Sequence, residues 1–205
     1  MLDRALLRLL QPVTTGVARR LHRAGIGADA ITWASFAFGM AACAAIVQQQ
    51  YAVAIVLMLG GRAADGLDGA VARLGTPTDR GAFLDITLDF LFYAGVPLAF
   101  AWADPERNAL AAATLLAAFL GTGSSFLALA TLAARRGIHN PAMPNKGFYF
   151  VGGLTEGTET IVCFIAMCLW PAHFPLLAYG FAVLCAVTIA TRVAAGLTLL
   201  GRDGG

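Results

Sequence analysis

Charged residues are scarce in this chain of 205 residues: they make up 13% of it, against 59% hydrophobic residues. A soluble domain is usually about half apolar and about a quarter charged. The composition therefore excludes an ordinary soluble domain and indicates a membrane protein. The formal net charge is only +2, and no Lys/Arg-rich run with interleaved aromatic residues is present, so the sequence also excludes a nucleic-acid-binding protein.

Lysine and paired cysteines are lacking as well. Lys146 is the only lysine, and this preference for arginine, with the abundance of alanine, indicates a bacterial chain. The cysteines all lie in apolar runs, and none forms a Cys-x-x-Cys pair or a Cys/His cluster with zinc spacing. We interpret them as buried, reduced thiols that pack as small hydrophobic residues.

Long apolar runs make up most of the sequence. A helix needs about 20 apolar residues to cross a bilayer core. Six runs approach or exceed that length, with polar or turn-forming residues between them: 30–48, 51–73, 79–101, 108–134, 148–170 and 174–198. The sequence predicts an all-α, polytopic membrane protein with six transmembrane helices, all within one domain that covers residues 30–200.

Residues 1–29 form a separate segment in which leucine and valine recur at helical spacing opposite arginines. This pattern favours an interfacial amphipathic helix on the cytoplasmic leaflet. Pro12 interrupts the pattern, so a plain cytosolic tail is the alternative. With six spans, almost all basic residues fall on one side of the membrane, which predicts that both termini are cytoplasmic.

Four aspartates lie inside the second and third apolar runs, where an unpaired carboxylate is costly. Asp65 and Asp68 are three residues apart and Asp85 and Asp89 are four apart, so each pair lies on one helix face. From the loop that joins the two helices, the pairs lie about 7–12 Å and about 9–15 Å deep, at a rise of 1.5 Å per residue. We expect two facing pairs that bind Mg²⁺ or Mn²⁺. On the carboxylates alone, a cation or proton pathway in a transporter is equally acceptable.

Small residues and an arginine beside the aspartates favour a different ligand. Gly69 and Ala72 follow Asp68, and Gly81 lies one turn before Asp85, so a ligand has room to approach the backbone. Arg73 lies one turn beyond Gly69 and pairs well with a phosphate. Metal ligands, an arginine and a small-residue groove together favour a diphosphate over a transported ion.

These residues together resemble the signature of the CDP-alcohol phosphatidyltransferase family, at the spacing of that family. The pattern is Asp65-x-x-Asp68-Gly69-x-x-Ala72-Arg73, then seven residues, then Gly81-x-x-x-Asp85-x-x-x-Asp89. The resemblance implies a CDP-linked donor, usually CDP-diacylglycerol, whose β-phosphorus is attacked by the hydroxyl of an alcohol acceptor while CMP leaves. It also implies a role in phospholipid biosynthesis, two Mg²⁺ (or Mn²⁺) ions, a bacterial inner-membrane location and a homodimer.

The same resemblance assigns roles to individual residues. Asp65, Asp68 and Asp85 are the implied metal ligands, and Asp89 is the implied general base, with a further contact to a metal. Residues implied to bind CDP are Gly69, Ala72, Arg73 and Gly81, together with Asp29 and Thr32. The last two match a Pro-Asn/Asp-x-x-Thr element found before the first span of many members, although Ala28 replaces its proline. An N-cap is the competing role for Asp29.

The acceptor alcohol is not identified by the sequence. Polar residues of the later spans are the candidates for its pocket: Lys146, Glu156, Glu159 and Arg192. The cations suit a phosphorylated alcohol, and the glutamates suit an amine or a polyol. A structural role, in which the glutamates pair with Arg62 or Arg192, is the alternative.

Two other classes of protein share some of these sequence features: membrane prenyltransferases and non-enzymatic membrane proteins. A membrane prenyltransferase also binds a diphosphate through Mg²⁺, but it lacks the Gly-x-x-Ala-Arg element. The non-enzymatic alternatives are a small membrane transporter and a family member that binds lipid without catalysis. Presence of all four aspartates argues against a degenerate, non-catalytic member.

Overall fold

A computed structural model describes residues 14–76, 78–137, 155 and 157–201, and these residues contain helices but no strand. Residues 14–23 are helical. The later elements are α2 (Ala28–Val47), α3 (Tyr51–Ala72), α4 (Asp79–Ala103), α5 (Pro105–Arg135), α6 (Gly157–Leu169), the short 3-10 helix η1 (Pro171–His173) and α7 (Phe174–Leu200). The prediction of an all-α fold is confirmed.

Helix bounds agree with the predicted runs to within three residues for α2, α3, α4, α5 and α7. The predicted run 148–170 is described only from residue 155, and α6 covers its second half. By length and composition, four described segments could cross a membrane: α2, α4, α5 and Pro171–Leu200. Helix α3 is long enough but carries Arg62, Asp65 and Asp68, and α6 has 13 residues. The count of six spans is therefore not confirmed.

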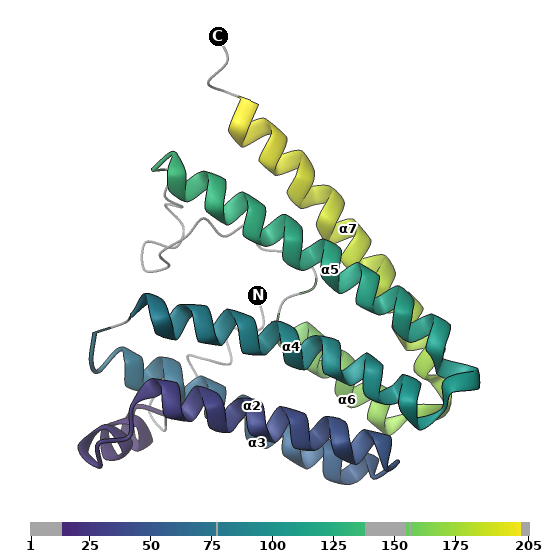
Figure 1. Ribbon diagram of the computed structural model, residues 1–205, viewed down its shortest axis with the longest axis horizontal. Helices are drawn as coiled ribbons and strands as arrows, with labels where there is room; N and C mark the ends of the chain where they lie inside the picture. The colour runs from purple at the N-terminus through teal and green to yellow at the C-terminus, as the bar shows by residue number, and fades with distance from the viewer. Residues whose placement is uncertain (1–13, 77, 138–154, 156, 202–205) are drawn as a thin grey trace.

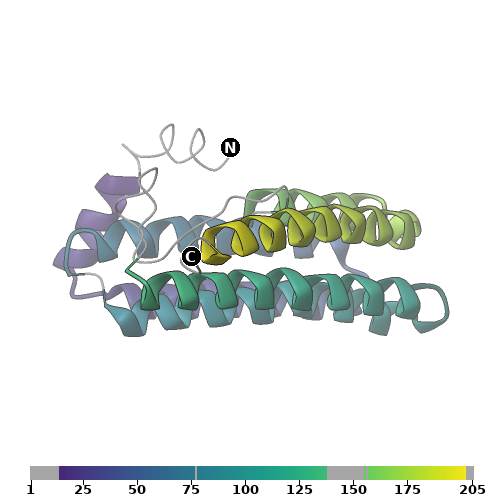
Figure 2. The same cartoon turned by 90° about the horizontal axis from the view of Figure 1, so that it is seen from above.

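The helices lie side by side along the long axis of the molecule (Figures 1 and 2). Helix α2 packs against α3 and α4, α5 packs against α4 and α7, and α6 contacts α3 and α7. The α3–α4 loop and the helix at residues 14–23 lie at one end of the bundle, and the α4–α5 turn lies at the other. In Figure 1, α5 and α7 diverge from α4 toward the α3–α4 end.

Aromatic rings fill the centre of the bundle. Phe100 stacks on Phe174 with 4.4 Å between ring centroids, and Tyr51 stacks on the same Phe100 at 5.8 Å. Such ring pairs contribute about 0.5–1.5 kcal/mol each beyond the burial of their surface. They tie α3, α4 and α7 together at the α4–α5 end, away from the acidic residues.

Glycines let two helix pairs approach closely around α4. A Cβ atom at Gly39 of α2 would lie 2.7 Å from the ring of Phe92, and one at Gly123 of α5 would lie 2.8 Å from the ring of Phe90. Both distances are too short for a real contact, so a side chain at either position would push α4 away. The glycines therefore help to hold α4, and the aspartates on it, in place.

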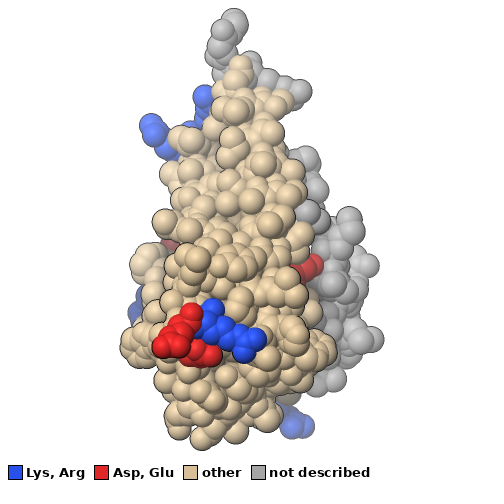
Figure 3. All heavy atoms as spheres, turned by 90° about the vertical axis from the view of Figure 1, so that its right-hand side faces the viewer, with Lys and Arg blue, Asp and Glu red and all other residues tan. Residues whose placement is uncertain are grey.

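Large apolar side chains cover the outside of the bundle. Val56, Trp102, Leu110, Leu120, Leu176 and Leu197 are each 69–73% exposed. An apolar surface of this extent is unfavourable in water and is expected where lipid chains surround a protein. Figure 3 shows a compact group of acidic and basic side chains on a largely apolar face at the α4–α5 end, where the turn contains Asp104, Glu106 and Arg107, and further charged side chains at the edges of the view.

The predicted N-terminal amphipathic helix is not confirmed. Residues 1–13, which include most of its apolar positions, lie outside the described part of the chain. The helix at residues 14–23 packs through Ala18 against Ile31, Ala70 and Val71 of α2 and α3. Val17, expected on its apolar face, is 37% exposed.

Candidate active site

A tight connection brings the acidic ends of α3 and α4 together. After α3 ends at Ala72, the backbone N–H of Gly81 donates to Thr78 Oγ1 at 3.1 Å, so Thr78 caps the N-terminus of α4. An extended residue with such a side-chain acceptor is a favoured helix start. Helix α4 therefore begins a few residues after α3 ends, and its first turns lie beside the last turns of α3.

Asp65, Asp68 and Asp85 form one cluster across this connection. Each carboxylate offers an oxygen that lies within 4.8 Å of the oxygens of the other two. Asp68 is buried, Asp65 is half-buried and Asp85 is exposed. The sequence prediction of facing acidic pairs is thus confirmed for these three residues.

The cluster fits a divalent cation. At Mg–O distances of about 2.1 Å, two oxygens on opposite sides of one Mg²⁺ ion lie about 4.2 Å apart. The three oxygens lie within 4.8 Å of one another, close enough for small side-chain rotations to bring them onto one ion, and hard carboxylate oxygens are the ligands that Mg²⁺ and Mn²⁺ prefer. Carboxylates this close repel one another, and a bound cation would remove the repulsion.

Thr32 of α2 holds the buried member of the cluster. Its hydroxyl oxygen lies 2.7 Å from Asp68 Oδ2, to which it donates, and 3.1 Å from the carbonyl oxygen of Ala28. Thr32 is itself buried. Partners of metal ligands fix ligand orientation, and replacing them typically weakens metal binding about 10- to 100-fold. The sequence prediction made Thr32 a nucleotide contact, whereas in the structure it supports a candidate metal ligand.

The variant Thr32→Val separates these two roles. Valine keeps the shape and removes the hydroxyl, so a metal-orienting role predicts an increase of about 10-fold in the Mg²⁺ concentration needed for half activity. A nucleotide contact predicts instead a higher KM for the CDP-linked donor at saturating Mg²⁺. Thr114→Val is the matched control, because Thr114 is half-buried on α5 and its hydroxyl donates to the carbonyl oxygen of Leu110 in the same helix. Metal titrations identical to wild type would refute the metal-orienting role.

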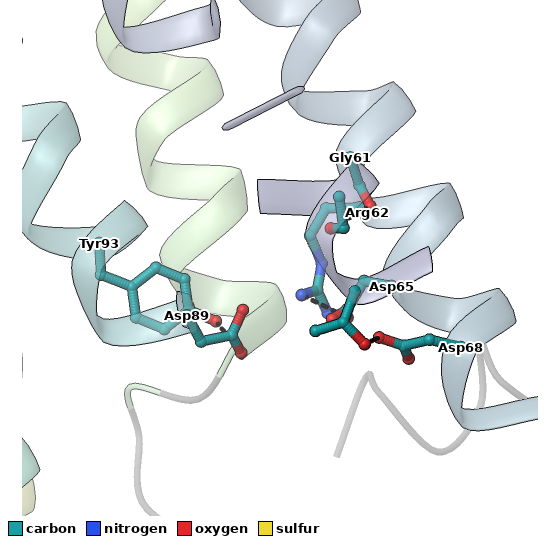
Figure 4. A network of polar contacts seen from close by, with 8 residues as sticks. Gly61, Arg62, Asp65, Asp68, Asp89 and Tyr93 are labelled. Carbon is teal, nitrogen blue, oxygen red and sulfur yellow. Dashed lines mark hydrogen bonds and ion pairs between the residues drawn. The ribbon is translucent and has the colours of Figure 1, made fainter. Parts of the chain in front are cut away.

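Asp89 stands apart from the three clustered aspartates. It lies on α4 one turn beyond Asp85, outside the group whose oxygens converge. Its carboxylate accepts a hydrogen bond from Tyr93 Oη at 3.3 Å. In Figure 4 the carboxylate of Asp89 faces Asp65 and Arg62 on α3 across the site.

A shared cavity connects Asp89 with the cluster. Its polar wall contains Thr32, Ser35, Arg62, Asp65, Asp85 and Asp89, and its apolar wall contains Phe36, Gly39, Met58, Leu88 and Phe92. The polar wall faces the α3–α4 end, and the apolar wall lies deeper between α2, α3 and α4. Asp89 is therefore within the site while remaining outside the three-carboxylate cluster.

Arg62 is the cation of this cavity among the described residues. Its Nη1 lies 2.7 Å from Asp65 Oδ2, three residues along the same helix. Ser35 fixes the neighbouring turn, because its Oγ donates to the carbonyl oxygen of Gly61 at 2.9 Å. The arginine offsets part of the negative charge of the aspartates.

Apart from Thr32, the residues predicted to bind CDP lie at the end of α3 and at the starts of α2 and α4, outside the lining of the cavity. Asp29 Oδ2 pairs with Arg80 Nε at 3.2 Å, and a Cβ at Gly81 would lie 3.5 Å from Asp29 Oδ1. On α3, a Cβ at Gly69 would lie 3.3 Å from Nη1 of Arg73, so the guanidinium lies over this glycine. Ala72, between them in sequence, is half-buried. Asp29 therefore lies close to Gly81, and a shared nucleotide subsite for the two residues stays a prediction.

The candidate acceptor residues are only partly described. Lys146 and Glu156 lie outside the described residues. Glu159 lies in the first turn of α6, and its buried Oε2 has no hydrogen-bond partner among the described residues. Arg192 of α7 is buried, and its Nη1 donates to Thr122 O at 2.7 Å and to Ser125 Oγ at 3.2 Å on α5. These contacts join α7 to α5 and involve no glutamate, so the pairing of Arg192 with a glutamate stays a prediction.

Comparison with known proteins decides the family. A model of the CDP-alcohol phosphatidyltransferase family matches residues 26–194. The chain belongs to this family. Membership assigns the general class of reaction, a phosphatidyl-type transfer in phospholipid biosynthesis, and confirms the resemblance found in the signature residues.

Relatives of the family agree with this assignment. The inner membrane protein YnjF of Escherichia coli (strain K12) is 50% identical over 200 residues, which cover 98% of this chain and 97% of that protein. The phosphatidylinositol phosphate synthase of Mycobacterium tuberculosis, solved with CDP-DAG bound, is 22% identical with a TM-score of 0.74, and the match covers 91% of this chain and 94% of that one. Its complex with manganese and citrate gives a TM-score of 0.72 at 22% identity, covering 90% and 89%. The solved structures confirm the fold.

Three contacts of the site were not predicted from the sequence. The bonds from Tyr93 to Asp89 and from Arg62 to Asp65 follow spacings of four and three residues, so helical periodicity could have suggested both. The bond from Thr32 to Asp68 joins residues 36 apart, and no local pattern announces it.

Proposed function

We propose that this protein transfers a phosphatidyl group from CDP-diacylglycerol to the hydroxyl of an alcohol acceptor. The acceptor oxygen forms a bond to the β-phosphorus, the bond from that phosphorus to CMP breaks, and the hydroxyl proton leaves to a base. CMP and a new phospholipid are the products. The observation that carries the proposal is the cluster of Asp65, Asp68 and Asp85 within the family signature.

In this proposal, Asp65, Asp68 and Asp85 hold Mg²⁺ or Mn²⁺, with two ions at the full site. A bound cation supplies neutralisation of the diphosphate charge and of the leaving CMP. Support for the cation comes from the spacing of the three carboxylate oxygens and from the manganese complex of the solved family member. Thr32 orients Asp68.

Asp89 is the proposed general base. It is the signature aspartate outside the convergent cluster, and it lines the same cavity. A carboxylate left free of the cluster can accept the hydroxyl proton as the new P–O bond forms. A further contact of Asp89 with a second cation is part of the proposal.

The proposed CDP subsite lies around the end of α3 and the starts of α2 and α4. Gly69, Ala72 and Gly81 present little side chain there, and the guanidinium of Arg73 pairs with a phosphate. Asp29, whose Oδ1 would lie 3.5 Å from a Cβ at Gly81, completes this subsite. Thr32 contributes to the same region from α2.

The acceptor pocket is proposed on the later helices, where Lys146, Glu156, Glu159 and Arg192 are the candidates. For Glu159, the support is its buried carboxylate oxygen without a described partner, since such an atom is normally satisfied by a ligand, water or side chain. The identity of the alcohol is left to experiment.

We also propose a membrane arrangement. Helix α3 and a longer α6 segment complete six spans, residues 1–29 form the interfacial helix, and 30–200 form the catalytic domain. Both termini face the cytoplasm of a bacterial inner membrane, because Arg19, Arg20, Arg23, Arg73 and Arg80 lie at the α3–α4 end, with Arg107 at the opposite end, and the relative from Escherichia coli is an inner membrane protein. The active unit is a homodimer.

Purified protein in lipid nanodiscs tests the reaction. With Mg²⁺ and CDP-diacylglycerol, we expect CMP release only after a matching alcohol is added, and loss of release after chelation by EDTA. The alcohols to compare are serine, glycerol phosphate, inositol phosphate, choline and ethanolamine. Glu106→Gln, exposed at the opposite end of the bundle, is expected to behave as wild type. Tight donor binding without CMP release for any alcohol would instead identify a non-catalytic lipid-binding member, and cation flux after reconstitution into sealed liposomes would identify a transporter.

A further inference from the structure

Tyr93 places a hydroxyl group directly on the proposed base. It lies on α4 one helical turn beyond Asp89, and its Oη donates to Asp89 Oδ2 at 3.3 Å. In Figure 4 the phenol extends along α4 so that its oxygen lies beside the carboxylate. The signature of the family, as it stands in this chain, ends at Asp89 and does not include Tyr93.

Four aromatic rings hold the Tyr93 ring in place. Its centroid lies 6.5 Å from that of Phe90, 5.9 Å from Phe92, 6.4 Å from Phe119 and 6.3 Å from Phe164. These partners come from α4, α5 and α6, so the ring cannot swing away without disturbing three helices. The hydroxyl position is therefore set by the packed core of the bundle.

The start of α6 covers the same hydroxyl. A Cβ at Gly157 would lie 3.4 Å from Tyr93 Oη and 3.8 Å from Arg62 Nη2. Because Arg62 pairs with Asp65, the first residue of α6 lies beside groups that contact both the proposed base and one candidate metal ligand. A bulkier residue at 157 would restrict the space around these polar groups.

The carboxylate of an aspartate rotates easily, because its terminal torsion is broad. A hydrogen bond to Oδ2 restricts that rotation and leaves Oδ1 available to another partner. We propose that Tyr93 is a positioning residue, which orients Asp89 so that Oδ1 receives the proton of the acceptor hydroxyl. This inference rests on the proposed function, in which Asp89 is the general base.

Replacing Tyr93 by Phe tests the role of the hydroxyl, because phenylalanine preserves the ring and its aromatic contacts. We expect kcat to fall about 10-fold, which corresponds to a loss of about 1.4 kcal/mol in transition-state stabilisation, because the base loses the hydrogen bond that orients it. The KM for CDP-diacylglycerol and the thermal stability should stay at their wild-type values. Tyr51→Phe is the matched control, because Tyr51 stacks on Phe100 at the far end of the bundle.

A comparison in the Asp89→Asn background separates positioning from a structural effect. If Tyr93 acts through the base, Tyr93→Phe should change the residual rate of Asp89→Asn less than about 2-fold, since coupled residues are not additive. An equal 10-fold loss in both backgrounds would overturn the inference, as would full activity of Tyr93→Phe beside an active wild type. Absence of CMP release by wild-type protein with every alcohol would overturn the proposed function and this inference with it.

Discussion

Asp68→Asn is expected to lower the rate of CMP release by about a thousandfold, because one ligand charge is lost from a site that stabilises several kcal/mol of developing charge. Asp68 is the buried member of the cluster, so water cannot readily replace its carboxylate. Asparagine has almost the same size and can still accept the hydrogen bond from Thr32. The substitution therefore removes charge with little change in packing.

Two measurements should report this variant together. The first is the rate of CMP release at increasing Mg²⁺, where we expect no recovery within the range that saturates wild type. The second is thermal unfolding: Mg²⁺ should raise the Tm of wild type and leave that of Asp68→Asn nearly unchanged. An ion stabilises the folded protein by mass action only when it binds the folded state, and the variant lacks a ligand for it. Glu106→Gln, which also removes one acidic charge, should keep both responses.

Without a cation, Asp68→Asn should be at least as stable as wild type. Removing one of three converging carboxylates relieves repulsion, since like charges at this distance destabilise one another. Two results together would show that the cluster does not hold the functional metal: Asp68→Asn keeps wild-type activity to within about 2-fold, and Mg²⁺ raises the Tm of the variant as it raises that of wild type.

The substitution Asp89→Asn should lower kcat by about 10²- to 10⁴-fold, which is the rate enhancement that a general base typically contributes. Binding of the CDP-linked donor should be retained. The reason is the position of Asp89, outside the three converging carboxylates but within the same cavity. Asparagine preserves the shape and an acceptor for Tyr93, and it removes the group that takes the proton.

Measured separately, donor binding and turnover distinguish the two proposed roles of Asp89. A general base predicts an unchanged affinity for CDP-diacylglycerol, read from equilibrium binding with Mg²⁺, and a much lower rate. A role confined to metal binding predicts a loss of affinity that higher Mg²⁺ restores. Full activity of the variant would exclude Asp89 from proton transfer altogether.

Much of the fold was predictable because membrane helices are long apolar runs with turn residues between them. The bounds of α3, for example, were predicted to within one residue from Gln50 before it and Gly75 after it. The converging aspartates were predictable too, because spacings of three and four residues place side chains on one helix face. The span count was less secure, since the same aspartates and Arg62 make α3 too polar to be recognised by composition alone.

The spacing of the aspartates alone did not divide them into three and one; that division came from the resemblance to the family, and the structure shows the geometry behind it. Asp85 and Asp89 share a face, but one turn separates them by about 6 Å along the axis, and the rotation of α4 against α3 decides which carboxylate reaches the cluster. Contacts between distant segments, such as Thr32 with Asp68 or Arg192 with Thr122, depend on the same packing. Packing also sets the contacts of Arg192 with α5, which no spacing in the sequence could indicate.

The most direct test of the proposed transfer follows the two phosphorus atoms of the donor. CDP-diacylglycerol is labelled with radioactive phosphorus at either the cytidine-linked or the lipid-linked position and incubated with protein, Mg²⁺ and the alcohol that supports CMP release. Transfer of the phosphatidyl group predicts that the cytidine-linked label leaves in CMP and that the lipid-linked label appears in a new phospholipid that contains the alcohol. Both labels staying in the donor, or the lipid-linked label appearing without the alcohol attached, would contradict it.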